Sequence, residues 1–115
     1  MGYDTASSAD VPSVIDGDDG DMWFLKDALD ADHLGVSILE LDPGSAGVEH
    51  DESESGQEEV YVCVAGEATF EVGGDTVVLS RHDALRVDAT EERQVFNHDD
   101  ERVELVIVGA PTSAN

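Results

Sequence analysis

The sequence predicts an all-β domain built as a sandwich or a barrel. Its apolar segments are short, rich in β-branched residues, and separated from one another by Gly, Asp, Asn or Ser. The segments expected to be strands are residues 36–41, 60–64, 68–72, 76–79, 84–87, 93–97 and 103–108. So many short strands within 115 residues are typical of a sandwich or barrel, and this length allows one domain with one core.

The chain divides into three parts. Residues 1–20 are rich in Asp, Ser, Gly and Ala and show almost no apolar periodicity, so we expect a mobile acidic N-terminal segment. Residues 21–110 are expected to form the folded domain, and residues 111–115 a short tail. Neither an internal repeat nor a low-complexity linker interrupts the predicted domain.

Two stretches near the start can add to the predicted sheet. Val11, Val14 and Ile15 fit a short edge strand. Trp23 and Phe24 lie in a segment that mixes helical and extended signals. We expect that segment to be a strand or a short turn that places both aromatic side chains on the core.

Two later features define the ends of the predicted sheet. Gly73 and Gly74 stand between two apolar runs and predict a hairpin, because the central positions of a primed turn favour positive φ. Residues 103–109 are apolar at nearly every position, so the inner face of this strand is expected to contact the barrel and its outer face a neighbouring sheet or subunit. The sequence therefore predicts a homodimer, with a folded monomer as the alternative.

The formal charge of −23, from 28 acidic and five basic residues, is spread along the whole chain. Such a surface is typical of adaptation to high salt, where counterions screen the self-repulsion of the folded state. The alternative is a dedicated cation-binding face. Five scattered basic residues cannot neutralise a run of phosphates, so we expect no nucleic-acid partner and no anionic membrane.

Cys63 is the only cysteine and lies in an apolar run, which predicts a buried core residue and no disulfide. The first residues show neither a basic patch nor an apolar segment. We therefore expect no signal peptide, no membrane span and a cytoplasmic location.

One stretch carries residues that metal chemistry uses. Gly44 is followed after five residues by His50, and Glu59 after six by Gly66. The pattern resembles the first conserved motif of the cupin superfamily, G-x5-H-x-H-x(3,4)-E-x6-G, in which the histidines and the glutamate are metal ligands. Here Glu52 stands at the second histidine position, and the loop before Glu59 is two or three residues longer.

A second cupin motif, G-x5-P-x-G-x2-H-x3-N with a variable gap before the histidine, supplies the fourth metal ligand. Gly74, followed after five residues by Ser80, stands at its start, and Arg93 precedes Asn97 with the spacing of its histidine and asparagine. The ligand position is thus an arginine. The resemblance covers about residues 35–109, and the chain looks like the small acidic single-domain cupins of halophilic archaea. It implies a double-stranded β-helix, or jelly-roll, barrel.

Alternation along the strands places the candidate residues. If Glu59 faces the barrel interior, Tyr61 and Cys63 face it too, because side chains alternate between the two faces of a strand. The same rule puts Arg93 and Asn97 on one face of a later strand. Glu59 and Arg93 are therefore both expected to point into the cavity.

The first functional hypothesis follows from the resemblance. It implies that His50, Glu52 and Glu59 hold one divalent metal ion, Mn, Fe, Ni or Zn, in a barrel that binds a small polar or anionic metabolite. One imidazole and two carboxylates suit Fe(II), Mn(II) and, less well, Zn(II). Whether the protein is an enzyme stays open, since one barrel serves many chemistries.

Arg93 supports a second hypothesis. A guanidinium is not a metal ligand and keeps its charge at ordinary pH, but it can pair with Glu59 or bind a carboxylate or phosphate. The protein is then a metal-free binding module whose ligand contacts Arg93, Tyr61 and Asn97. A third possibility is an interaction or structural protein with a vestigial pocket.

Overall fold

The computed structural model describes residues 2–15 and 19–112. Within these residues the chain forms one short 3-10 helix, η1 Ser8–Asp10, and eight strands. The strands are β1 Gly20–Phe24, β2 Gly35–Leu41, β3 Gln57–Ala65, β4 Ala68–Val72, β5 Asp75–Leu79, β6 Ala84–Val87, β7 Arg93–Phe96 and β8 Val103–Pro111. The all-β prediction is confirmed, but β3 begins three residues earlier and ends one residue later than predicted, and β8 ends three residues later than predicted.

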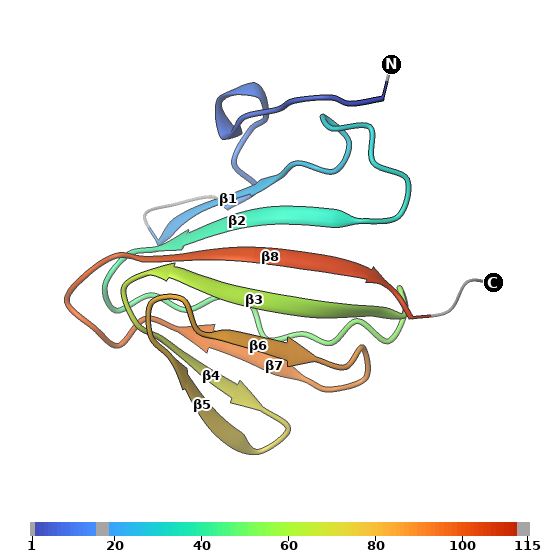
Figure 1. Ribbon diagram of the computed structural model, residues 1–115. Helices are drawn as coiled ribbons and strands as arrows, with labels where there is room; N and C mark the ends of the chain where they lie inside the picture. Colours follow the sequence, from blue (N-terminus) through green and yellow to red (C-terminus); the bar gives the residue numbers. More distant parts are fainter. Residues whose placement is uncertain (1, 16–18, 113–115) are drawn as a thin grey trace.

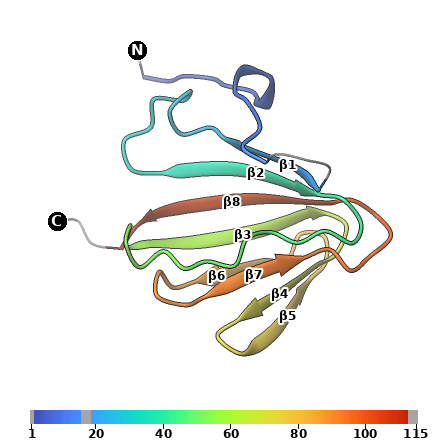
Figure 2. The same ribbon diagram turned by 180° about the vertical axis from the view of Figure 1, so that it is seen from behind.

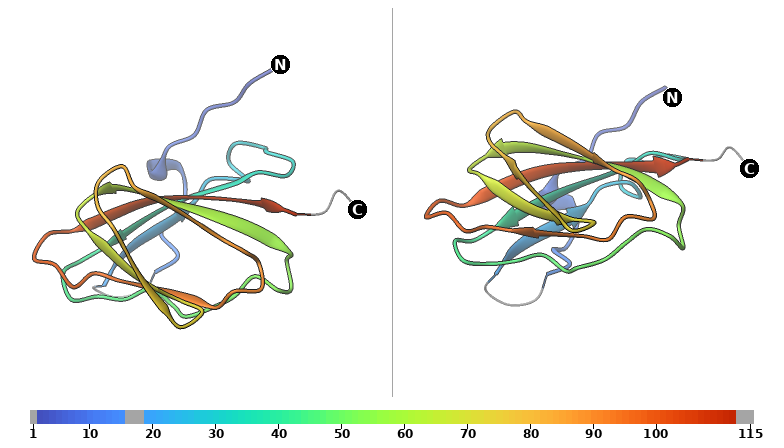
Figure 3. Two further views of the ribbon diagram at one scale, coloured as in Figure 1. Left: turned by 60° about the horizontal axis from the view of Figure 1, so that its bottom comes forward. Right: turned by 90° about the horizontal axis from the view of Figure 1, so that it is seen from below.

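The strands form two antiparallel sheets. One has the order β1-β2-β8-β3-β6 and the other the order β5-β4-β7. Figures 1 and 3 show the smaller sheet lying against one face of the larger one, so that the two sheets enclose an interior. The strand β8 is central in the larger sheet, paired with β2 on one side and β3 on the other. Its outer face, which includes Val106 and Val108, is half-buried.

The segment between β2 and β3 extends the smaller sheet. Residues 44–52, called the strap here, run beside β7, as Figure 2 shows. His50 and Arg93 exchange reciprocal backbone hydrogen bonds of 3.0 and 2.9 Å, and the Gly47 amide donates to the Val95 carbonyl oxygen at 2.8 Å. A reciprocally bonded pair presents both side chains on the same face. The strap therefore brings His50 and Arg93 to the barrel interior together.

The core lies between the two sheets. Residues paired across neighbouring strands point to the same face of the larger sheet. Their side chains therefore form rows that run across the sheet from β1 to β3. Two inward rows are Met22-Leu39-Leu105-Cys63 and Phe24-Ser37-Ile107-Tyr61. The Tyr61 ring meets Phe70 of β4 edge to face, with a centroid distance of 4.9 Å, and this contact joins the sheets. The predicted inward face of Glu59, Tyr61 and Cys63 is confirmed.

Two expectations about the first residues are wrong. Val11, Val14 and Ile15 form no strand, although the Val14 amide donates to the Met22 carbonyl oxygen at 2.8 Å. Phe24 is 53% exposed rather than part of the core. Trp23 and Phe24 are adjacent in β1 and so point to opposite faces, and Phe24 lies at the end of its row, near the mouth of the barrel.

Two further features agree with expectation. Gly73 and Gly74 connect β4 and β5 with φ values of 53° and 91°. Cys63 is fully buried, and its thiol donates to the carbonyl oxygens of Ala65 and Gly66 at 3.5 and 3.4 Å. No helix in the described part of the chain is long and apolar enough to cross a membrane.

Candidate functional site

His50, Glu52 and Glu59 converge at the mouth of the barrel. The first two lie on the strap and the third on β3. The His50 Nε2 atom is 3.3 Å from a Glu52 carboxylate oxygen and 3.8 Å from a Glu59 carboxylate oxygen. One ligand atom from each residue lies within 4.8 Å of the others. We call this group the triad, and the sequence prediction that these residues lie together is confirmed.

The orientation of His50 is set by its second nitrogen. Nδ1 lies 3.0 Å from the Val48 carbonyl oxygen, which can only accept, so Nδ1 carries a proton and donates it. Nε2 then turns toward the two carboxylates with a lone pair when the ring is neutral. This is the tautomer in which an imidazole binds a cation through Nε2. One nitrogen and two carboxylates in this arrangement fit a divalent transition-metal ion.

Tyr61 fixes one of the carboxylates. Its hydroxyl donates to Glu59 Oε1 at 2.8 Å, and its side chain is almost fully buried. Burial, and after it the negative charge of Glu59, raises the pKa of Tyr61 well above its ordinary value. The phenol therefore stays protonated and continues to hold Glu59 across the ordinary pH range.

Arg93 lies opposite His50 and is almost completely buried, with 1% of its surface exposed. Its Nη2 donates to the Asp88 carbonyl oxygen at 3.0 Å, while Nε and Nη1 are buried and find no hydrogen-bond partner among the described residues. No ion pair joins it to Glu52 or Glu59 in the described chain. This guanidinium beside the triad is therefore a positive charge without a carboxylate partner within the described part of the chain. Burying a charge in this way costs several kcal/mol.

The structure does not bring Asn97 to the site. The side chain is fully buried, and Nδ2 donates to the carbonyl oxygens of Leu41 and Glu101 at 3.0 and 2.8 Å. Oδ1 accepts from the Asp99 amide at 3.0 Å. With these contacts Asn97 holds the turn before β8 against the end of β2. Alternation placed it on the correct face but gave no information about its depth or its backbone partners.

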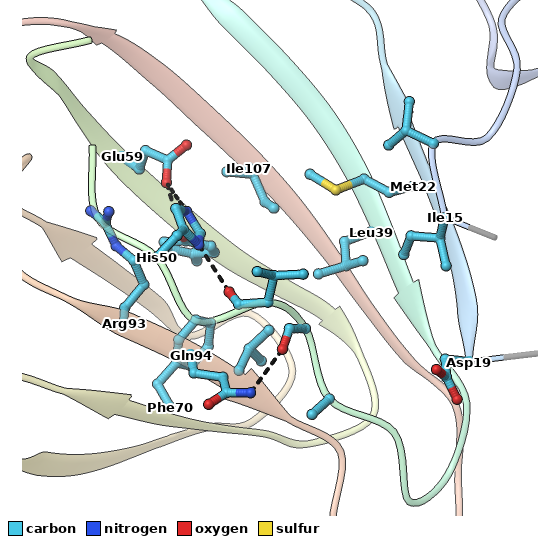
Figure 4. Close-up of a pocket in the computed structure, with 16 residues that line it drawn as sticks. Ile15, Asp19, Met22, Leu39, His50, Glu59, Phe70, Arg93, Gln94 and Ile107 are labelled. Atoms are coloured by element: carbon cyan, nitrogen blue, oxygen red, sulfur yellow. Dashed lines mark hydrogen bonds and ion pairs between the residues drawn. The ribbon is translucent and has the colours of Figure 1, made fainter. Parts of the chain in front are cut away.

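An inner cavity of about 440 Å³ lies between the sheets. Figure 4 shows His50, Glu59 and Arg93 grouped at one end and Ile15, Met22 and Asp19 at the other. Apart from this polar end its walls are mainly apolar. Sequence analysis did not identify Val14, Ile15, Met22 and Gln94 as wall residues, because the N-terminal segment and the strap take their place only through long-range contacts.

A second space, the outer hollow, lies on the other side of the triad and has a volume of about 510 Å³. It shares His50, Glu59, Met22 and Ile107 with the inner cavity. Its other lining residues come from the first two strands and their connection, the strap, and the facing ends of β3 and β8: Phe24, Lys26, Asp27, Gly35, Val36, Ser37, Glu52, Gln57 and Gly109. The triad therefore stands between two spaces of similar size.

A family model described as the cupin domain matches residues 37–109, the part of the chain that carries both motifs and most of the barrel. The chain belongs to the cupin family. This cupin has the jelly-roll barrel that its sequence predicted. Residues at three of the four ligand positions of the cupin motifs meet in space, so the triad is a possible metal site.

Three solved structures illustrate the similarity. A cupin protein from Bacteroides fragilis has 21% identity and a TM-score of 0.78, with 100% of this chain and 89% of that chain covered. A predicted oxalate decarboxylase from Thermotoga maritima has 23% identity and a TM-score of 0.75, with coverage of 93% and 98%. A sugar phosphate isomerase from the cupin superfamily, from Silicibacter pomeroyi, has 22% identity and a TM-score of 0.72, with coverage of 89% and 69%. These likenesses show the fold. A comparison with curated proteins found no match.

Proposed function

We propose that this cupin binds one divalent metal ion through His50, Glu52 and Glu59 and holds a small polar or anionic metabolite beside it. The convergence of the triad, with His50 Nε2 directed at both carboxylates, is the observation that carries the proposal. Mn, Fe, Ni and Zn all accept mixed nitrogen and oxygen ligands. Such an ion, when bound, supplies a Lewis acid next to the cavity.

The surroundings of the triad support an anionic metabolite. Arg93 is a buried positive charge without an ion-pair partner among the described residues, and it lines the inner cavity. A negative group on a ligand would compensate this charge. Two of the related structures, the predicted oxalate decarboxylase and the sugar phosphate isomerase, are named for substrates that carry negative charge.

Arg93 also favours a second candidate, a binding module without metal. It occupies the fourth ligand position of the family motif, where a fixed positive charge repels a divalent ion. In this case Arg93 would offset part of the negative charge of Glu52 and Glu59, and the ligand would be oriented without chemistry.

Elemental analysis separates the two candidates. Protein purified in concentrated KCl, without chelator or affinity tag, is expected to carry one of the four metals in stoichiometric amount. Glu59→Gln removes a charged ligand and should lose the metal. Glu58→Gln is the matched control, because Glu58 lies next to Glu59 on the opposite face and is 3.7 Å from Arg86. A metal-free wild type, or equal metal in both variants, would leave the binding module as the better candidate.

We also propose that the protein works in the cytoplasm of a cell with high internal salt, as a homodimer. The charge of −23 supports the first part. The dimer is supported by half-buried apolar residues on the outer face of the larger sheet, where Val36, Val108 and Val60 lie side by side on three paired strands.

A further inference from the structure

The outer hollow owes its depth to glycine. In one row of the larger sheet Gly35 of β2 pairs with Gly109 of β8, which pairs with Glu59 of β3. A Cβ atom at Gly35 would meet only the Gly109 carbonyl oxygen, at an ordinary contact distance of 3.6 Å, and Gly35 does not have a positive φ. A larger residue would therefore fit the strand and favour it. The structural effect of glycine here is open space beside Glu59.

Lys26 differs from the four arginines in its surroundings. Arg86 and Arg102 form surface ion pairs with carboxylates, Arg93 is buried, and Arg81 is exposed in the turn before β6. Lys26, the only lysine, is half-buried, lines the outer hollow, and forms no ion pair with a described residue. In a chain with 28 acidic residues, a cation left without a carboxylate partner beside a cavity is available to a ligand.

A metal ion would make the charges around the triad more favourable for a negative group. Three carboxylates, those of Asp27, Glu52 and Glu59, line the outer hollow, and Lys26 is its basic side chain. With a divalent ion on the triad, the ion and Lys26 balance these three carboxylates, and Arg93 adds a positive charge at the neighbouring end of the inner cavity. Without the ion, Lys26 alone faces the three carboxylates of the outer hollow. A singly charged anion therefore binds the metal-loaded protein more favourably than the metal-free one.

The inner cavity favours an apolar occupant. Away from the triad its walls include Ile15, Met22, Leu39, Phe70, Val95 and Ile107. Arg93, with two donors unpaired among the described residues, lies at the triad end of this cavity and Asp19 at the opposite end. Between these ends the polar side chains are already used, because Gln94 Nε2 donates to the Gly47 carbonyl oxygen at 2.9 Å and the Tyr61 hydroxyl donates to Glu59. A sugar or polyol lying along this middle part would bury hydroxyl groups without partners, which is unfavourable. An alkyl or aryl body would gain free energy from leaving water.

We infer that the outer hollow is a carboxylate subsite, in which Lys26 binds the acid group of a small monocarboxylic acid while the apolar body of that acid occupies the inner cavity. Arg93 lines the inner cavity and stabilises the acid group through its charge, but its Nε and Nη1 atoms are buried, whereas the Lys26 side chain lines the outer hollow and can contact the acid group directly. The inference rests on the proposed metal site and narrows its metabolite to an amphipathic acid.

Calorimetric titration of hexanoate into protein loaded with Mn(II) tests this inference. Wild type is expected to bind hexanoate, and 1-hexanol, which has the same chain without the charge, should bind at least about tenfold more weakly. Lys26→Gln should weaken hexanoate binding by a similar factor, and Lys26→Arg should restore it. Arg81→Gln is the matched control, because it removes the same charge from an exposed turn and should leave hexanoate binding unchanged.

A steric variant gives an independent test. Gly35→Leu fills the outer hollow without backbone strain, so it should abolish hexanoate binding while the protein keeps its metal. Elemental analysis of every sample separates the proposed metal site from the proposed carboxylate subsite. Wild-type protein that cannot be loaded with Mn(II) refutes the metal site. Equal hexanoate affinity in wild type and Lys26→Gln, equal affinity for 1-hexanol, or no hexanoate binding by the loaded protein refutes the subsite.

Discussion

At the scale of single residues, the hydrogen bond from Tyr61 to Glu59 makes the stability of the protein depend on pH. The phenol has to stay protonated to donate, and burial keeps it so by raising its pKa above the unfolded value of 10.0. The folded state therefore binds this proton more tightly than the unfolded state does. The contribution of Tyr61 to stability is complete below that unfolded value and is lost as the pH rises above it.

This behaviour can be measured by ultraviolet absorbance. The chain has two tyrosines, so the difference between wild type and Tyr61→Phe isolates one phenol. We expect the phenolate absorbance of Tyr61 to appear only when the circular dichroism shows unfolding, at a pH above 10.0. An ionisation of Tyr61 in the folded protein near its unfolded value would contradict the buried hydrogen bond.

Residue positions were predictable where a strand fixes them. Alternation in β3 and β7 correctly turned Glu59 and Arg93 to the interior, because the strand period of two leaves only two choices. It could not show that Arg93 would lack an ion pair, which depends on distances of a few ångströms across the barrel. The position of Lys26 at the site was not predicted, because Lys26 lies in the connection between β1 and β2, where no strand alternation fixes the direction of a side chain.

At the scale of elements, the end of β3 depends on Gly66. This residue has a φ of +74°, and a Cβ there would lie 2.7 Å from the Arg102 carbonyl oxygen and 3.1 Å from Val103 Cα. Both contacts are with the backbone that enters β8, which cannot move without disturbing the central strand of the larger sheet. The family motif places a glycine at this point, and the structure gives a steric reason for it.

A pair of glycine variants can isolate that clash. Gly56 has a similar φ of +67° but no atom within 4 Å of a Cβ. Gly56→Ala should cost about 1 kcal/mol of unfolding free energy through backbone strain alone. Gly66→Ala should cost at least about 1 kcal/mol more, because strain and overlap add. Urea denaturation of both variants measures the difference, and equal midpoints would show that the backbone yields to the extra methyl group.

The strands were predictable from the sequence, whereas the strap was not. Each strand carries its own alternating or apolar pattern, and so its existence is a local property. Residues 44–52 carry no such pattern, and their path is fixed by pairing with β7 more than 40 residues later in the chain. The longer loop before Glu59 forms a turn at residues 53–56, which lets Glu52 and Glu59 meet despite the altered spacing.

At the scale of the whole molecule, negative charge opposes both folding and association. A charge of −23 on 115 residues repels itself across the barrel and also between two subunits. Salt screens this repulsion over about 10 Å at 0.1 M and over about 3 Å at 1 M. The half-buried apolar outer face of the larger sheet then becomes able to pair with a second copy.

Melting and sedimentation should therefore change together with salt. Between dilute buffer and about 2 M KCl we expect the melting temperature to rise by at least about 10 °C, which corresponds to roughly 2 kcal/mol for a domain of this size. Over the same range the sedimenting species should change from monomer to dimer. A melting temperature that is indifferent to KCl would refute the salt adaptation, and a monomer at every salt concentration would refute the dimer.

The burial of Cys63 has a practical consequence for such experiments. The only thiol of the chain is fully enclosed and hydrogen-bonded, and burial raises its pKa, so the native surface of the described chain offers no competing site for a maleimide dye. A single cysteine introduced at Ser37, in the outer hollow, would then carry the only dye. Ligand arrival could be followed optically in the otherwise natural protein, without an assay for turnover.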